Sequence, residues 1–190
     1  MEEDKMSQLK ISDWLEQGLA LLATEGIEAL TIDAMCQKLG VTKGSFYHHF
    51  KNRQAYLKAI LEYWEEEYTS RFISYSQQGI SKEEQIERLN QLVVKAFGGN
   101  EVYIRSWAQV DPLAREFQER VDQRRINYLY ELHKNWLADE KEAYAMAQLT
   151  YSSLIGSQTI MPRLTKDEFK IMTQLLGHFI LTRSKQENQA

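Results

Sequence analysis

Residues 43–51 carry side chains that could recognise nucleic acid. The segment holds basic, small and hydrogen-bonding residues and no acidic residue, namely Lys43, Gly44, Ser45, Tyr47, His48, His49 and Lys51. Such a short helix suits the major groove of DNA, where the first residues of a recognition helix meet base edges. Phe46 and Phe50, at i and i+4, would face the protein core instead. The pattern therefore predicts contacts to phosphates and bases.

Positioning these side chains requires a scaffold, and residues 31–50 predict two short helices around a glycine-centred turn. Thr31 is a suitable N-cap for a helix over 32–39 that buries Ile32, Met35, Cys36 and Leu39. Gly40 stands where a left-handed residue would end that helix. Thr42 can cap the second helix, which we expect to run to about His49. The segment therefore predicts a helix-turn-helix.

The charge of the chain is unevenly distributed along the sequence. The net charge is −4, which by itself disfavours a nucleic-acid partner. Residues 34–61, however, contain five bases and no acid, whereas residues 1–33 contain eight acids and two bases. Positive charge is needed only where phosphates approach, because counterion release is local to the contact. The basic window coincides with the predicted helix-turn-helix, although a chance fluctuation on a solvated face is the alternative.

Helical periodicity dominates the whole chain, and no convincing strand is found. Capping patterns mark several helix starts, including Ser81–Glu84, Asp111-Pro112 and Thr165–Glu168. We expect an all-α fold of about nine helices. Their expected ranges are 8–24, 32–39, 43–49, 52–77, 81–97, 101–109, 112–137, 139–161 and 165–181.

Composition narrows the class of protein. No apolar run reaches the roughly 18 residues of a membrane span, and the acidic N-terminus lacks the apolar core of a signal peptide. A single cysteine, Cys36, cannot form an intramolecular disulfide, so a cytoplasmic location is expected. We expect no enzyme activity and no cofactor, because Glu-x-x-His, Gly-x-Ser-x-Gly and phosphate-binding glycine loops are absent. No metal site is expected either, since the adjacent His48 and His49 would point about 100° apart on a helix.

The helix-turn-helix resembles that of the TetR/AcrR-type family of transcriptional regulators. The resemblance rests on Thr31, on Gly40-Val-Thr-Lys-Gly-Ser45 and on Phe46-Tyr-His-His-Phe-Lys51. It implies a three-helix DNA-binding domain over residues 7–67, with its motif at 31–50, and a ligand-binding and dimerisation domain over 68–190. The acidic segment Met1–Asp4 departs from the basic N-terminal arm of many members, so we expect no strong contribution from an arm.

The resemblance also implies roles for individual residues at the DNA. Phosphate contacts are expected from Thr31, Thr42, Tyr47, His48 and Lys51, with Arg53 as a further possibility. Base or mixed contacts are expected from Lys43, Gly44, Ser45 and His49. A half-buried core position is the alternative for Tyr47, and a small hydrophobic core residue is the plain interpretation of Cys36.

The C-terminal region is expected to bind a small effector and to dimerise. Its aromatic residues would suit an apolar or aromatic molecule, with Tyr103, Trp107, Tyr128 and Tyr151 as the candidate wall. Plain core packing is the alternative for each of them. Residues 141–160 and 165–182 are expected to pair with a second copy, because small residues (Ala143, Ala147, Ser153, Gly156, Ser157) stand beside large ones (Phe169, Met172, Leu176, Phe179).

The sequence thus predicts a ligand-responsive homodimeric regulator, a repressor that is released from a palindromic operator in double-stranded DNA when it binds its effector. The effector itself is unknown. The alternative is a helical dimeric interaction protein without ligand control.

Overall fold

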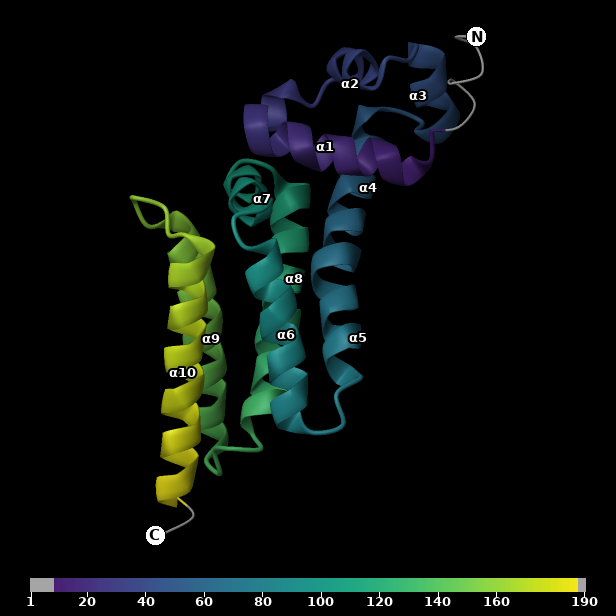
Figure 1. Ribbon diagram of the computed structural model, residues 1–190. Helices are drawn as coiled ribbons and strands as arrows, with labels where there is room; N and C mark the ends of the chain where they lie inside the picture. Colours follow the sequence, from purple (N-terminus) through teal and green to yellow (C-terminus); the bar gives the residue numbers. More distant parts are fainter. Residues whose placement is uncertain (1–8, 188–190) are drawn as a thin grey trace. The chain divides into compact units, whose positions relative to one another are not determined.

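The computed structural model describes residues 9–187, which fold into helices joined by turns (Figure 1). Within this range nine helices are found when the unbroken run from Arg53 to Gln77 is counted once, and there is no strand. The predicted all-α class is confirmed. The bounds are α1 Ile11–Glu25, a 3-10 turn η1 Ile27–Ala29, α2 Ile32–Leu39, α3 Lys43–His49, α4 Arg53–Glu65, a π-helical turn η2 Glu66–Ser70, α5 Arg71–Gln77, α6 Lys82–Ala96, α7 Glu101–Ala108, α8 Pro112–His133, α9 Glu140–Thr159 and α10 Lys166–Glu187.

Two helix ends differ from the predicted ranges. The helix expected to reach residue 137 ends at His133, where the main-chain N–H groups of Trp136 and Leu137 both donate to the His133 carbonyl in a turn. The helix expected to end near residue 181 continues to Glu187. The residues that extend it include arginine, lysine, glutamine and glutamate, which have high intrinsic helix propensity.

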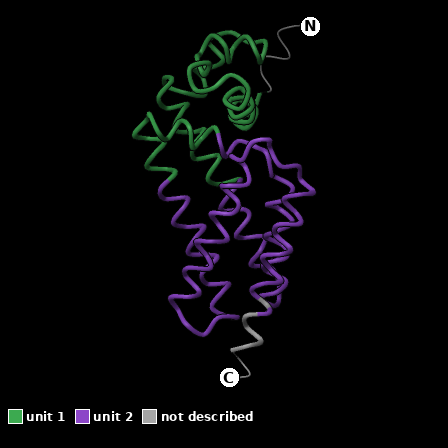
Figure 2. Tube along the Cα trace, turned by 90° about the vertical axis from the view of Figure 1, so that its left-hand side faces the viewer, with its two compact units in different colours: residues 1–67, 103–118 green, residues 68–102, 119–190 purple. Residues whose placement is uncertain are grey.

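The described residues form two compact units, coloured separately in Figure 2. Unit 1 comprises the residues up to 67 together with 103–118, and unit 2 comprises 68–102 together with the residues from 119 on. Residues 103–118 therefore cluster with the N-terminal helices, although they follow the boundary that we predicted at 67/68. The assignment of separate functions to the two sides of that boundary stays a prediction.

Unit 1 is organised around an aromatic core. Trp14 of α1, Phe46 of α3 and Tyr56 of α4 are at most 1% exposed, and the rings of Trp14 and Tyr56 both lie edge-on to Phe46 at 5.6 and 5.5 Å. The Tyr56 hydroxyl donates to the Trp14 carbonyl at 2.7 Å. This bond satisfies a polar group that burial would otherwise leave at a cost. The contacts tie α1, α3 and α4 into one body.

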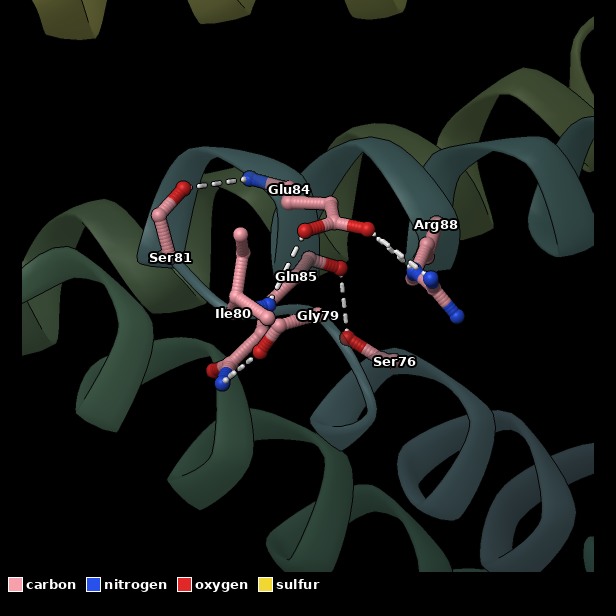
Figure 3. Close-up of polar contacts among 7 residues, drawn as sticks. All are labelled: Ser76, Gly79, Ile80, Ser81, Glu84, Gln85 and Arg88. Atoms are coloured by element: carbon pink, nitrogen blue, oxygen red, sulfur yellow. Dashed lines mark hydrogen bonds and ion pairs between the residues drawn. The ribbon is translucent and has the colours of Figure 1, made fainter.

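Within unit 2, a tight polar turn joins α5 to α6 (Figure 3). Ser81 accepts a hydrogen bond from the Glu84 main-chain N–H at 3.2 Å, as the predicted capping pattern requires. The Glu84 carboxylate accepts in return from the Ile80 N–H at 2.9 Å and also pairs with Arg88 at 2.8 Å. The Ser76 hydroxyl donates to the Gln85 carbonyl across the turn.

Helices α9 and α10 lie side by side in unit 2 (Figure 1). Ala143, Met146 and Leu137 form a buried cluster with Ile180 of α10, and α10 also meets the end of α6, where Phe97 and Phe169 stack at 4.2 Å. Ala143, Ala147, Ser157 and Phe169 are each at most 2% exposed within a single copy. Our expectation that they form the seam with a second copy was wrong, because they already pack inside unit 2.

Large apolar side chains cover the outer faces of the same two helices. Leu149 of α9 is 52% exposed, and Ile171, Leu175 and Phe179 of α10 are 55–65% exposed. The three α10 residues follow one another at intervals of four, so they share one face of the helix. Among the described residues, none of the helices combines the length and apolar character needed to cross a membrane.

Candidate nucleic-acid interface

Helices α2 and α3 are joined by the turn that the sequence predicts. The Thr31 hydroxyl accepts from the Ala34 main-chain N–H at 3.1 Å and caps α2. Gly40 is left-handed, at φ 67° and ψ 35°, and the Val41 N–H returns to the Cys36 carbonyl at 2.9 Å. Thr42 occupies the N-cap position of α3 in an extended conformation, without a side-chain capping bond. A left-handed residue is needed at position 40, and glycine adopts that conformation without a Cβ clash.

The inner face of α3 is fixed by the aromatic core of unit 1. Phe46 is fully buried, and Phe50, just after the helix, lies 4.8 Å from the Tyr56 ring. Helix α1 can approach α4 closely because position 18 is glycine, where a Cβ would stand 2.3 Å from the Tyr56 hydroxyl oxygen. The outer face of α3 is thereby held in a defined orientation on a rigid support.

Most of the predicted DNA-contacting residues are exposed, either on the outer face of α3 or in the turns beside α2 and α3. Tyr47 is 56% exposed, so its alternative placement in the core does not apply. The remaining exposed members are Thr31, Thr42, Lys43, Gly44, His48 and Lys51. Ser45 and His49 are half-buried, and the His49 ring lies 6.1 Å from that of Trp14. The exposed set contains a phenol, hydroxyls, an imidazole and two ammonium groups, which are donors suited to phosphate and base edges.

Lys43 is paired with an acid that the sequence reasoning did not connect to it. Its Nζ lies 2.6 Å from Asp33 Oδ1 of α2, and both side chains are largely exposed. The hydrogen bond to Asp33, with the negative charge of that carboxylate, raises the pKa of Lys43. Any phosphate or base that binds Lys43 must therefore compete with Asp33.

Arg53 has structural partners within unit 1. Its Nε donates to the Leu30 carbonyl at 2.6 Å, and Nη2 donates to the Ile27 carbonyl at 3.3 Å. These bonds hold the loop before α2 against the start of α4. Sequence reasoning missed them, because acceptors more than twenty residues away leave no local pattern. A phosphate contact by Arg53 stays a prediction.

The candidate effector residues are divided between the units. Tyr103 and Trp107 belong to unit 1, whereas Tyr128 and Tyr151 belong to unit 2. In unit 2 the Tyr128 hydroxyl donates to Ser76 Oγ at 2.8 Å, and the Tyr151 hydroxyl donates to Asp122 at 2.7 Å. The two tyrosines of unit 2 thus carry hydrogen-bonded hydroxyls and do not present a purely apolar surface.

An all-helical chain whose N-terminal helices form a helix-turn-helix with a basic, acid-free outer helix defines a class, the helix-turn-helix DNA-binding proteins. Residues 15–60 match the model of the bacterial regulatory proteins of the tetR family. The transposon Tn10 TetC protein of Escherichia coli is 49% identical over 39 residues, which are 20% of this chain and 20% of that protein. The matches span about a fifth or less of the curated relatives' own length.

Solved structures resemble the fold over most of its length. A protein from Saccharomonospora viridis in complex with choline has a TM-score of 0.70 at 16% identity, covering 90% of this chain and 94% of that one. AibR, in complex with isovaleryl coenzyme A and operator DNA, has a TM-score of 0.67 at 17% identity, covering 90% and 98%. At these identities the likeness establishes the fold. The family match itself covers residues 15–60, the helix-turn-helix and the start of α4.

Proposed function

We propose that the protein is a transcriptional regulator that binds a palindromic operator as a homodimer. The observation that carries the proposal is the outer face of α3, where exposed Lys43, Tyr47 and His48 stand on a helix fixed from behind by Phe46. A single helix-turn-helix offers little surface, so two copies reading half-sites about 34–36 Å apart, or somewhat more, are the expected arrangement. Repression, as in the prediction from sequence, is the mode that we propose.

A second copy of this chain is the proposed partner of α9 and α10. The two helices carry the exposed apolar residues Leu149, Ile171, Leu175 and Phe179, which a second copy would cover. Gly156 of α9 has no atom within 4 Å of where its Cβ would stand, so a helix of a second copy could approach closely there. Twofold symmetry is the usual closed solution for such a surface.

We further propose a small organic effector. Tyr103, Trp107, Tyr128 and Tyr151 remain our candidates for contacting it, and the structural neighbours crystallised with choline and with isovaleryl coenzyme A support an organic ligand. An effector at Tyr128 or Tyr151 must leave their hydrogen bonds intact or replace them. A mainly apolar or aromatic molecule that also carries a polar group meets that requirement.

Selection from a random pool of double-stranded DNA tests the function. The full-length protein should enrich an inverted repeat. Its affinity for the enriched fragment should fall steeply as the salt concentration rises, because the release of counterions from the DNA then favours binding less. The selected fragment then serves to screen organic compounds for release of DNA. Absence of any enriched sequence would favour the alternative, a helical interaction protein, and would contradict the regulator.

A further inference from the structure

Arg125 of α8 joins segments of unit 2 that are far apart in sequence. Its guanidinium donates to Thr69 Oγ1 of η2 at 2.9 Å and to Glu101 Oε2 of α7 at 2.9 Å. It also donates to the Tyr68 carbonyl and to the Tyr151 hydroxyl of α9, each at 3.2 Å. One side chain therefore connects η2, α7, α8 and α9.

The pair of Arg125 and Glu101 is largely removed from water. The two side chains are 13% and 12% exposed. Burial lowers the pKa of the Arg125 guanidinium, but the charges and hydrogen bonds of Glu101 and Tyr151 together outweigh burial, so the net direction is upward. A buried ion pair gains little net stability, because desolvation offsets the attraction. Its geometry is therefore more informative than its energy.

The contacts of Arg125 lie close to the points where the chain passes from one unit to the other. The chain passes between the two units at residues 67/68, 102/103 and 118/119. Tyr68 and Thr69 follow the first passage at once, and Glu101 precedes the second by two residues. Arg125 itself lies about two helical turns after the third passage. Contacts of Arg125 within unit 2 thus fix the chain beside each passage to unit 1.

The first passage also coincides with an irregular turn. Residues Glu66–Ser70 are π-helical between the α-helical segments α4 and α5. A π turn is rare and contains one residue more than the corresponding α turn. Arg125 binds a carbonyl and a hydroxyl of this turn, and the neighbouring Arg124 donates to Ser70 Oγ at 2.9 Å. If the turn relaxed to α-helix, the residues before it would rotate by roughly 100° relative to those after it.

We propose that Arg125 is a positioning residue for DNA recognition, which holds the π-helical turn and the start of α7 in one arrangement and thereby sets the half-site spacing that the dimer prefers. This inference rests on the proposed function and names the residue through which unit 2 acts on the DNA-binding residues. An effector that disturbs the contacts of Tyr151 would reach the π turn through Arg125, since both contacts belong to one guanidinium.

The test uses the full-length protein and the DNA fragment selected on it, together with fragments whose spacer between half-sites is longer or shorter by one or two base pairs. Arg125→Met should reduce the preference of the wild type for its selected spacer by about tenfold, the factor that separates affinities by 1.4 kcal/mol. Hydrogen exchange of residues 66–72 should become faster, while residues 32–49 should exchange as before. Arg125→Lys keeps the charge but lacks the planar guanidinium with its several donors. Its spacer preference should lie between those of the wild type and Arg125→Met.

Arg88→Met is the matched control. Arg88 also forms a 2.8 Å ion pair in unit 2, with Glu84 of its own helix α6 (Figure 3), and this pair includes no residue beside a passage between the units. The variant should keep the spacer preference of the wild type. An unchanged preference in a folded, dimeric Arg125→Met, unchanged exchange of residues 66–72, or an equal loss in Arg88→Met would each overturn the proposal.

Two milder variants test the proposed role of Arg125 if Arg125→Met does not fold. Thr69→Val removes one hydroxyl at constant shape, and Glu101→Gln removes the charge of the pair. Both variants should reduce the difference in affinity between fragments with the selected spacer and fragments with a longer or shorter one, and both should speed hydrogen exchange of residues 66–72. Wild-type behaviour in both variants would overturn the proposal. A wild-type protein that selects no DNA sequence would instead refute the proposed function, and the exchange measurement would still test the hold of Arg125 on the π turn.

Discussion

The Nζ atom of Lys43, the first residue of α3, lies 2.6 Å from Oδ1 of Asp33 in the first turn of α2. The pair places an acid beside the residue that we expect to read bases. Asp33→Asn should therefore raise affinity for the selected DNA by up to about fivefold, since an exposed ion pair is weak and competes only modestly. Fluorescence anisotropy at physiological salt measures the change. Glu25→Gln, which breaks the exposed Lys38–Glu25 pair of the same unit, is the control. Equal or weaker binding by Asp33→Asn would contradict the competition.

Variants that lose a phosphate contact should change DNA binding differently from variants that lose a base contact. Tyr47→Ala and Lys51→Ala should weaken binding to all sequences alike, because phosphate contacts carry no base information. Lys51→Ala should also reduce the slope of log affinity against log salt by about one. Lys43→Ala should instead relax the preference at particular bases by about 1–3 kcal/mol. Unchanged operator affinity in all three variants would show that α3 is not the recognition helix.

The close approach of α1 and α4 predicts a cost at Gly18. A Cβ at this position would stand 2.3 Å from the Tyr56 hydroxyl oxygen and 2.7 Å from Ile60 Cδ1. Gly18→Ala should lower the free energy of unfolding by about 1–3 kcal/mol through overpacking, measured by urea denaturation. The cost should be smaller in a Tyr56→Phe background, where the nearest oxygen is gone. Equal costs in both backgrounds would show that the hydroxyl is not the obstacle.

Dimerisation through α10 predicts sensitivity at Leu175, which is 65% exposed in a single copy. Leu175→Glu places a charge where a second copy should bury an apolar side chain, and an unpaired buried charge is strongly unfavourable. Equilibrium sedimentation at micromolar concentration should show a monomer with weakened DNA binding. Ile80→Glu, at a site 97% exposed in the α5–α6 turn, should remain dimeric. A dimeric Leu175→Glu would place the interface elsewhere.

His133 predicts a loss of stability in mild acid. The side chain is fully buried, its Nε2 lies 3.2 Å from Thr150 Oγ1, and burial lowers its pKa to about 4 from an ordinary value of 6.5. The unfolded chain then binds the proton more readily between these two values, so stability should fall as the pH drops from about 6.5 towards 4. The shift corresponds to about 3 kcal/mol.

Urea denaturation across this pH range measures the effect. His133→Leu should abolish most of the pH dependence, even if it changes the stability at neutral pH. His178→Gln, at an exposed position of α10, should leave the dependence unchanged. A wild-type stability that is flat between pH 6.5 and 4 would exclude a neutral buried His133.

Local features of the sequence were sufficient to predict the helix-turn-helix. Thr31 as a cap and Gly40 as a left-handed residue act within one helical turn, so their effect on the backbone does not depend on distant partners. The spacing of Phe46 and Phe50 likewise indicated which side of α3 would face inward, and the structure confirms it. The exposure of Tyr47 follows from the same helical phase.

The partners of charged and small residues were decided only by the tertiary structure. The sequence did not indicate that the Arg53 guanidinium binds the Leu30 carbonyl, nor that Arg125 binds Thr69. Ala147 was expected between two copies, but it is buried within one. A repeating pattern identifies the apolar face of a helix, since periodicity is a property of that helix alone. Which residue covers that face, and which carbonyl or carboxylate reaches a given guanidinium, depends on segments brought together from distant parts of the chain.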